Sequence, residues 1–232
     1  MSILQTTELK KYYGTKPNIT KALDGVNLSV EQGEFVAIVG TSGSGKSTLL
    51  NMIGGLDVPT SGNVIVDGRD LSTLKDEQLT IFRRRKIGFI FQNYNLVPVL
   101  NVFENIVLPV ELDGNKVDKK FMNEVVQMLG LEDKLNNMPN NLSGGQQQRV
   151  AIARSLINNP SILLADEPTG NLDSTTSKEV LHMFKDLNRR QGITVILVTH
   201  DPKIAAFTDR AINMADGLIC EGISDTLSKD DV

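Results

Sequence analysis

Cysteine, excess positive charge and long apolar runs are all scarce in this sequence of 232 residues. The one cysteine, Cys220, cannot form an internal disulfide and fits a reducing compartment. The net charge of −4 gives no electrostatic reason to expect nucleic-acid binding. The N-terminus lacks the apolar core of a signal peptide, and no stretch approaches the length that spans a bilayer. We therefore expect a cytosolic protein, which would need another chain to act in a membrane.

The composition is that of an ordinary soluble protein, with 40% hydrophobic and 22% charged residues. The length suits one large domain, or a core with a subdomain. The only dense basic run is residues 83–86, which we predict to be a solvated helix end.

Four short apolar runs organise the chain, and each closes on a glycine or a polar residue. Such runs, separated by helical stretches, indicate strands of a mainly parallel sheet that is buried on both faces. Ligands of these sheets bind beyond the carboxyl ends of the strands, so all four endings should face one place. The runs and their endings are Phe35–Val39 with Gly40, Ile87–Phe91 with Gln92, Ile162–Ala165 with Asp166 and Glu167, and Thr194–Thr199 with His200.

The first ending indicates a nucleotide. Residues 40–47 match the phosphate-binding pattern G-x-x-x-x-G-K-[ST] between a strand and a helix, although a glycine-rich turn without nucleotide is the alternative. Backbone N–H groups and the helix N-terminus would surround the phosphates. Lys46 should reach the β- and γ-phosphates, and the Ser47 hydroxyl should coordinate Mg²⁺. The predicted ATP-binding residues of this loop are Gly40, Thr41, Ser42, Gly43, Ser44, Gly45, Lys46, Ser47 and Thr48.

The third ending supplies two carboxylates in series. Asp166 follows four apolar residues and should hold Mg²⁺ directly or through water. Glu167, one residue further, could act as the general base for an attacking water. The alternative for Glu167 is a surface acid in a turn.

Gln92 and His200 are ambiguous when each is taken alone. A glutamine after a strand is most often a loop residue, although its amide oxygen can coordinate Mg²⁺. A lone histidine is most often structural. Their positions beside the phosphate loop and Asp166 favour functional roles for both. His182, on a predicted helix surface without a partner in the pattern, is interpreted as structural.

The stretch LSGGQQQR, residues 142–149, predicts a helix with two glycines in its first turn. Ser143 can cap this helix, and Gln146 completes a capping box. Each glycine weakens a helix by roughly 1 kcal/mol relative to alanine. Capping does not require Gly144 and Gly145, so we expect another group to approach their bare backbone.

Together these motifs resemble the ATPase domain of ATP-binding-cassette (ABC) proteins, over nearly the whole chain and in the family's order. The resemblance implies an α/β P-loop ATPase core with a mainly parallel sheet, an N-terminal antiparallel β segment to about residue 68, and an inserted α-helical subdomain. It implies one ABC domain over 1–232, in which 1–92 and 161–232 form the core and 93–160 the helical subdomain. The matching motifs are the P-loop 40–48, Gln92, the signature 142–146, the Walker B segment 162–167, the D-loop ending at Asp173, and His200.

The resemblance also implies a homodimer that buries two ATP molecules. The signature of one copy would bind the γ-phosphate held by the other copy, through an anion site at a helix N-terminus. Asp173 would lie at the same interface, and His200 would contact the γ-phosphate. Tyr12 looks like the aromatic that stacks on adenine, although Tyr13 could take that role. The signature residues are Leu142, Ser143, Gly144, Gly145 and Gln146, and the implied Mg²⁺ ligands are Ser47, Gln92 and Asp166.

The predicted subdomain carries a further signal. Residues 95–100 are unusually apolar for a loop, and they precede a helix that Asn101 should cap and that Pro109 should limit. This stretch either packs inside the subdomain or forms part of the groove where the family's membrane permease docks.

We therefore expect an ATP-hydrolysing subunit that dimerises beneath a separate membrane permease, at the cytoplasmic face of the membrane. Several longer stretches resemble the macrolide-efflux and lipoprotein-release group, which includes antimicrobial-peptide resistance transporters. That likeness implies export, or mechanical removal of peptide, lipoprotein or drug-like substrates. Two alternatives are a soluble ABC ATPase that serves DNA repair, translation or iron–sulfur assembly, and a nucleotide-gated regulator of a membrane partner.

Overall fold

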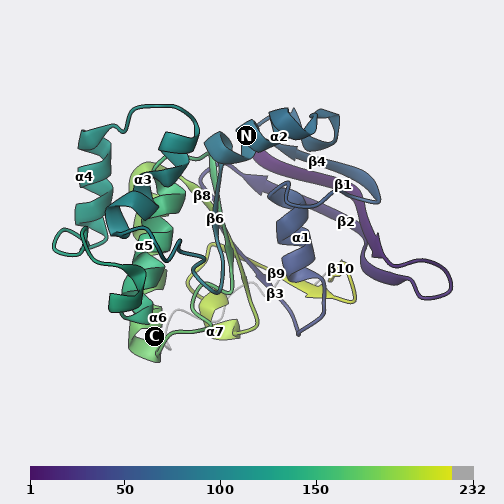
Figure 1. Cartoon of the computed structure of the whole chain (residues 1–232). Coiled ribbons are helices and arrows are strands. Elements are labelled where there is room, and N and C mark those ends of the chain that lie inside the picture. Colours follow the sequence, from purple (N-terminus) through teal and green to yellow (C-terminus); the bar gives the residue numbers. More distant parts are fainter. Residues whose placement is uncertain (221–232) are drawn as a thin grey trace.

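A six-stranded sheet forms the centre of the fold in the computed structural model, which describes residues 1–220 (Figure 1). Its neighbouring strands pair in parallel except β10, which runs antiparallel to β9. The prediction of a mainly parallel sheet is therefore confirmed. In spatial order the strands are β10 (Leu218–Cys220), β9 (Arg210–Ala215), β3 (Phe35–Val39), β8 (Thr194–Thr199), β7 (Ile162–Asp166) and β6 (Ile87–Ile90).

The register of this sheet brings the predicted strand endings to one edge. Strands β3, β8, β7 and β6 are direct neighbours, and their carboxyl ends finish almost level. The glycine and polar residues that follow them therefore share the crevice at that edge. The paired residues nearest the edge are Val39 with Thr199, Asp166 with Val198, and Ala165 with Ile90.

Both faces of the parallel sheet are buried, as the continuous apolar runs predict. In β8, Val195 and Leu197 belong to one hydrophobic cluster, whereas Ile196 and Val198 belong to the other. All four side chains are fully buried. Each such side chain contributes about 1.5–3 kcal/mol of burial free energy, so the strands form a rigid platform for the residues at their ends.

A second, antiparallel sheet covers one face of the central sheet, and α1 (Lys46–Ile53) lies between the two (Figure 1). Leu9 and Val26 of this sheet pack in the same cluster as Leu49 of α1. The predicted N-terminal β segment is confirmed, and it ends with β5. In spatial order the strands are β2 (Thr20–Glu31), β1 (Ser2–Tyr13), β4 (Ser61–Val66) and β5 (Arg69–Asp70).

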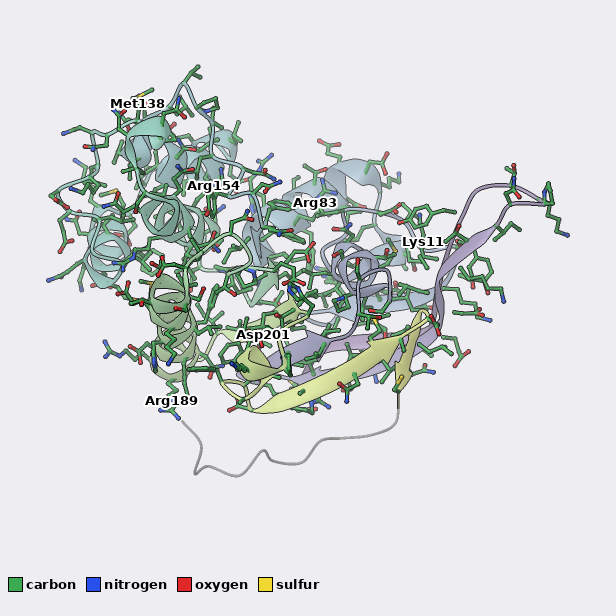
Figure 2. All side chains as sticks on the ribbon, turned by 90° about the horizontal axis from the view of Figure 1, so that it is seen from below. Lys11, Arg83, Met138, Arg154, Arg189 and Asp201 are labelled. Atoms are coloured by element: carbon green, nitrogen blue, oxygen red, sulfur yellow. The ribbon has the colours of Figure 1, made fainter. Side chains whose placement is uncertain are left out.

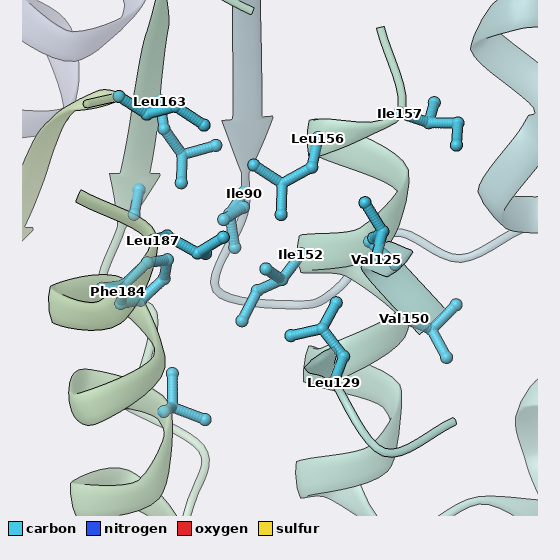
Figure 3. Packing of buried hydrophobic residues seen from close by; sticks show 14 of the residues in the cluster. Ile90, Val125, Leu129, Val150, Ile152, Leu156, Ile157, Leu163, Phe184 and Leu187 are labelled. Carbon is cyan, nitrogen blue, oxygen red and sulfur yellow. The ribbon is translucent and has the colours of Figure 1, made fainter. Parts of the chain in front are cut away.

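Helices cover the opposite face of the central sheet. Figure 3 shows Ile152 and Leu156 of α5 (Gly144–Leu156) packed toward Ile90 of β6, with Phe184 of α6 (Ser174–Gln191) beside them. The helices of the predicted subdomain are α3 (Val102–Leu112), α4 (Lys119–Met128), the short η2 (Pro139–Asn141) and α5 (Gly144–Leu156). The remaining helices are η1 (Leu71–Thr73), α2 (Asp76–Lys86), α6 (Ser174–Gln191) and α7 (Pro202–Ala205).

The predicted start of α3 is confirmed. The Asn101 side chain accepts a hydrogen bond from the Glu104 N–H, and Glu104 accepts one from the Asn101 N–H, both at 2.8 Å. The helix continues past Pro109 to Leu112. None of the helices within residues 1–220 is long and apolar enough to cross a bilayer.

The basic run ends α2 as predicted, but its side chains are not simply solvated. Arg84 and Arg85 bind Asp113 at 2.8 and 2.7 Å, and Lys86 binds Asp67 at 2.9 Å. Hydrogen bonds and charge from Arg85 and then Arg84 hold the pKa of Asp113 below its usual value. The run therefore ties α2 to the loop that follows α3. The second part of the predicted core, residues 161–232, includes residues 221–232, which lie outside the described part of the chain.

Candidate functional site

The loop between β3 and α1 has a backbone that only glycine accommodates. Gly43 and Gly45 have left-handed φ angles of 80° and 102°. A Cβ at Gly45 would lie 2.4 Å from the Ala22 carbonyl oxygen, and one at Gly40 would lie 2.2 Å from that of Met214. The loop is therefore folded tightly against β2 and β9.

Lys46 is a buried cation held only by carbonyl groups. Its side chain is 7% exposed, and its Nζ donates to the carbonyls of Gly40 and Thr41 at 2.8 and 2.7 Å. No carboxylate within the described residues forms an ion pair with it. The buried Ser44 hydroxyl beside it has no hydrogen-bond partner. Buried cations are normally paired, so this loop is suited to an anion.

The other predicted P-loop residues lie at the rim of the same loop. Thr41, Ser42 and Ser47 are exposed, and Thr48 is half-buried in the first turn of α1. The rim is thus accessible while Lys46 and Ser44 form its floor.

Ser47 and Asp166 form the oxygen pair predicted to hold Mg²⁺. The Ser47 hydroxyl donates to Asp166 Oδ1 at 3.0 Å. Burial, and next the nearby Glu167 carboxylate, raise the pKa of Asp166, whereas the Ser47 hydrogen bond and Lys46 oppose this rise. A hydroxyl and a carboxylate suit a hard cation such as Mg²⁺. Residues 1–220 hold no cluster of three or more His, Cys, Asp or Glu side chains placed to hold a metal, so phosphate oxygens and water would have to supply most ligands.

Glu167 and His200 meet at the end of the sheet. Glu167 Oε1 lies 2.8 Å from His200 Nδ1, and the Glu167 N–H donates to the Val198 carbonyl at 3.0 Å. Glu167 has a left-handed φ of 47°, a conformation that is unfavourable by roughly 1–2 kcal/mol for a residue with a side chain. This backbone turns the carboxylate toward His200. The carboxylate is 17% exposed, so it is sheltered yet open to a small molecule such as water.

Gln92 follows β6 on the same edge of the sheet, but its side chain is not joined to the oxygen pair. Its Nε2 lies beside Gly170, 3.0 Å from the position that a Cβ there would occupy. Among the described residues it makes no hydrogen bond to Ser47 or Asp166. The Asn171 side chain holds the Gln92 carbonyl at 3.0 Å.

The signature begins α5, and Ser143 caps it as predicted. The Ser143 hydroxyl accepts from the Gln146 N–H at 3.3 Å, and Gln146 Oε1 accepts from the Ser143 N–H at 2.9 Å. No hydrogen bond or ion pair within residues 1–220 links 142–146 to 40–48. The remaining backbone donors of the helix start therefore do not serve the chain's own phosphate loop.

Contacts within the chain also restrict the two glycines of the signature. A Cβ at Gly145 would lie 2.5 Å from Thr176 Cγ2 of α6, and one at Gly144 would lie 3.0 Å from the Tyr94 hydroxyl. Neither glycine has a left-handed φ. Close packing therefore already requires Gly145, which the sequence alone did not indicate.

Asp173 is the N-cap of α6. Its carboxylate accepts from the N–H groups of Thr175 and Thr176 at 3.1 Å and from the Thr176 hydroxyl at 2.6 Å. The Thr176 hydroxyl, followed by the Thr176 N–H, lowers the pKa of Asp173. Asp173 thus has a structural role in its own chain, beside any role at an interface.

Tyr12 and Tyr13 of β1 bind different partners. The Tyr12 hydroxyl donates to Asp24 on β2. The Tyr13 hydroxyl donates to Asp57 Oδ2 at 2.9 Å, in the loop after α1. Burial and this hydrogen bond raise the pKa of Tyr13, and a hydrogen bond with Thr48 opposes them. Tyr13 therefore lies near the first turn of α1. The partner of Tyr12, Asp24, donates its N–H to the Gly217 carbonyl, and the Gly217 N–H donates to the Ser44 carbonyl of the phosphate loop.

Sequence analysis missed Arg154 and Asn171, which hold the segment after β6. Arg154 donates to the carbonyls of Tyr94 and Asn95 at 2.8 and 2.7 Å. The one available signal was a charged residue inside the apolar part of the α5 sequence. His182 is exposed on α6 with its ring edge against Phe207, in line with a structural role.

A glycine loop between strand and helix, a buried lysine and two carboxylates at one sheet edge define a P-loop nucleotide-hydrolysing protein. The sequence model of the ABC transporter family matches residues 23–170. The chain belongs to the ABC transporter family, and it is an ATPase cassette.

Its relatives include both separate cassettes and larger proteins. It is 48% identical over 223 residues to the macrolide export ATP-binding/permease protein MacB of Syntrophobacter fumaroxidans, covering 94% of this chain but 31% of MacB. It is 48% identical over 222 residues to the ABC transporter ATP-binding protein MJ0796 of Methanocaldococcus jannaschii, covering 93% and 94% of the two chains. The chain thus spans about a third of MacB and nearly all of MJ0796.

Solved structures agree with the fold. The dimeric MJ0796 cassette in a post-hydrolysis state bound to ADP and Pi matches with a TM-score of 0.86 and 46% identity, covering 95% of this chain and 97% of that one. A second dimeric structure of MJ0796 matches with a TM-score of 0.85. The predicted fold class is confirmed.

Proposed function

We propose that two copies of this chain close around two Mg-ATP molecules, and that the closing and opening of this pair drives a separate membrane permease. The observation that carries the proposal is the juxtaposition of Lys46, the Ser47–Asp166 pair and the Glu167–His200 pair at one sheet edge. The dimeric MJ0796 cassette and the ATP-binding/permease organisation of MacB support it.

The loop at 40–47 would hold the triphosphate. A bound phosphate oxygen would replace the Gly40 and Thr41 carbonyls as the acceptor for Lys46 Nζ. The lysine side chain would turn toward the phosphate and remain buried. Ser47 and Asp166 would hold Mg²⁺, with Gln92 joining them once its amide turns from Gly170. When bound, Mg²⁺ would offset the raised pKa of Asp166 and neutralise charge on the phosphates.

Hydrolysis would use Glu167 as the base. A water hydrogen-bonded to its carboxylate would attack the γ-phosphorus and pass one proton to Glu167, while the bond from that phosphorus to the β–γ bridging oxygen breaks and ADP leaves. His200 keeps the carboxylate oriented through the 2.8 Å contact, and its exposed ring can also reach toward the γ-phosphate.

The signature would act on the second copy's nucleotide. Ser143 and the free N–H groups at the start of α5 would form an anion site, and no hydrogen bond within residues 1–220 joins those N–H groups to the phosphate loop. Two identical chains facing head to tail would place each such site on the other's γ-phosphate, in a two-fold contact that also includes Asp173. Loss of the γ-phosphate removes the charge that joins the halves, so the pair would loosen.

Tyr13 is the better candidate for the adenine contact. Tyr13 is 42% exposed and its hydroxyl is close to Thr48 in the first turn of α1, whereas the Tyr12 hydroxyl donates to Asp24 on β2. We therefore assign the stacking role to Tyr13 in place of Tyr12.

The membrane partner would dock beside the segment 95–100. Val99 is 78% exposed, while the buried Asn105 side chain binds the carbonyls of Val97, Leu100 and Asn101 and holds the segment in place. Next to it, a cavity of about 230 Å³ lies between the helices and the sheets. A permease there would place this chain at the cytoplasmic face of the membrane. MacB is a macrolide export protein, and this similarity supports export as the work of the pair. We extend the proposal to export or removal of peptide, lipoprotein or drug-like substrates.

The Glu167→Gln variant tests the core of the proposal. Loss of the base should abolish turnover while ATP binding survives, so the variant should sediment as a dimer with Mg-ATP and as a monomer with ADP. Normal hydrolysis by this variant would contradict the role of Glu167. Co-purification of this chain from detergent-solubilised membranes then tests for the membrane partner. Recovery of soluble proteins alone would favour the alternative function, a soluble ABC ATPase.

A further inference from the structure

The backbone just after Gln92 is held in an unusual conformation. Tyr94 and Asn95 have left-handed φ angles of 54° and 48°, and neither is glycine. Two such residues in succession are rare, because each Cβ crowds its own backbone. Such a conformation persists only when the surroundings enforce it.

Arg154 supplies that enforcement. Its guanidinium donates to the Asn95 carbonyl at 2.7 Å and to the Tyr94 carbonyl at 2.8 Å. These are the carbonyls of the two left-handed residues. Burial lowers the pKa of Arg154, and within residues 1–220 no carboxylate pairs with it. Arg154 is half-buried, and its two hydrogen bonds to the carbonyls of the left-handed residues fix the position of this segment.

The segment that Arg154 holds, Tyr94 and Asn95, also packs against the start of the signature helix. The Tyr94 hydroxyl lies 3.0 Å from the position that a Cβ on Gly144 would occupy, and Leu172 lies on the same side at 3.6 Å. Arg154 and Gly144 belong to one helix, α5, so the segment is attached to that helix at its end and rests against its start. Movement of Tyr94 would change the surface beside the signature's free N–H groups.

Arg154 is also accessible from the outside of the molecule. It lines a cavity together with Arg83 of α2, Phe89 of β6 and Pro109 of α3, and Figure 2 labels both Arg83 and Arg154. Arg154 therefore belongs to the signature helix, binds the segment after Gln92, and lines the cavity beside which we place the membrane partner.

We propose that Arg154 is a positioning residue for the signature: its two hydrogen bonds hold Tyr94 against Gly144, so that the start of α5 keeps the shape that closes on the second copy's phosphate. The inference rests on the proposed dimer, because the affected step is closure of the pair. Nucleotide binding to one chain uses the loop at 40–47 and should not depend on Arg154.

Dimer affinity in the Glu167→Gln background tests the proposal. Adding Arg154→Met should weaken the Mg-ATP dimer by at least about tenfold in sedimentation, while ATP affinity of the dilute monomer stays within about twofold. Arg154→Lys, which keeps the charge but cannot hold both carbonyls as a fork does, should weaken it to a smaller extent. Arg154→Lys also carries the test if Arg154→Met does not fold.

Arg149→Met is the matched control. Arg149 lies on the same helix, donates to the Leu129 carbonyl at 3.4 Å and pairs with Glu179 at 2.6 Å, but does not touch the segment after Gln92. Its loss should leave dimer affinity within about twofold, even if thermal stability falls.

Amide hydrogen exchange separates positioning from general destabilisation. Peptides covering 92–97 should exchange at least about tenfold faster in Arg154→Met than in the parent, with no change in Arg149→Met. Unchanged exchange there, or an Arg154→Met dimer as tight as the parent, would overturn the proposal. A Glu167→Gln parent that stays monomeric would instead contradict the proposed dimer, and the exchange result would still decide whether Arg154 holds the segment.

Discussion

The Ser47 hydroxyl donates a 3.0 Å hydrogen bond to Asp166 Oδ1, which joins the first turn of α1 to the end of β7. Residues far apart in the sequence thus place two oxygen ligands beside the phosphate loop. The Asp166 carboxylate is partly desolvated there, and this raises its pKa. A divalent cation bound beside Asp166 would therefore stabilise the ionised form of its carboxylate.

The first prediction concerns the pH dependence of stability. The pKa of Asp166 lies above its ordinary value of 3.8 in the folded state, so folding takes up a proton between these two values. The contribution of this group to stability is greatest below pH 3.8 and is lost as the pH rises through the folded pKa. Without Mg²⁺, Asp166→Asn should therefore raise the melting temperature at neutral pH relative to the parent.

The advantage of Asp166→Asn should vanish at low pH, and its Mg-dependent ATPase activity should fall by about 10²-fold or more. Asp186→Asn, on the exposed face of α6, should change stability by less than about 0.5 kcal/mol. An Asp166→Asn protein less stable than the parent at neutral pH would show that the carboxylate stabilises the empty site.

Lys46→Ala should weaken ATP binding by roughly 10- to 100-fold, because charge-assisted hydrogen bonds contribute about 1.5–3 kcal/mol each. Lys46 is the buried cation of the loop, and no other lysine is buried within residues 1–220. Isothermal titration with ATP measures the effect. Lys120→Ala, on the exposed face of α4, serves as the control and should bind as the parent does. Tight binding by Lys46→Ala would remove the phosphate role from this residue.

Gly145→Ala should destabilise the fold by about 1–3 kcal/mol, since the new methyl group would lie 2.5 Å from Thr176 Cγ2. Without this clash, alanine in a helix would be stabilising. Thr176→Ser removes Cγ2 and keeps the hydroxyl bond to Asp173, so the double variant should recover most of the loss. Urea unfolding of the four proteins gives the coupling. Additive effects would mean that packing on α6 is not why residue 145 is glycine.

The assignment of Tyr13 predicts a difference between two adjacent residues. Tyr13→Ala should weaken ATP binding by roughly 5- to 100-fold, as loss of one stacked base contact does, and Tyr12→Ala by less than about twofold. Inorganic triphosphate, which has no base, should bind the parent and both variants equally. A larger loss of ATP affinity in Tyr12→Ala would restore Tyr12 to that role.

The central sheet and the residues that lie at its carboxyl edge were predictable because short-range signals agree with the fold. Apolar runs such as Thr194–Thr199 are long enough to identify buried parallel strands, and parallel strands must bring their carboxyl ends to one edge. The glycines and Lys46 of the phosphate loop then follow a fixed spacing.

The faces of β1 could not be predicted from alternation. Its pairing with β2 shifts register between Thr6 and Leu9, between Leu9 and Lys10, and between Lys11 and Tyr12. Each shift breaks the simple period of two that would assign side chains to faces. Tyr12 and Tyr13 therefore could not be distinguished until the strand was placed against α1.

Contacts between distant segments were also beyond the sequence. The packing of Gly145 on Thr176, and of Gly144 on Tyr94, depends on how α5, α6 and the segment after β6 meet. Arg154 likewise looks like an ordinary helical arginine until its two carbonyl partners are in place. These contacts decide how the signature is held, while the motif itself indicates only that it is there.

The central claim is that the signature of one copy binds the nucleotide of the other. Gly144→Arg added to Glu167→Gln tests it most directly, because the bulky side chain would block the start of α5 and leave the loop at 40–47 intact. In sedimentation with Mg-ATP, we predict that Glu167→Gln forms a dimer with two retained ATP molecules, and that the double variant binds ATP as a monomer. A double variant that dimerises as tightly as Glu167→Gln would contradict the account.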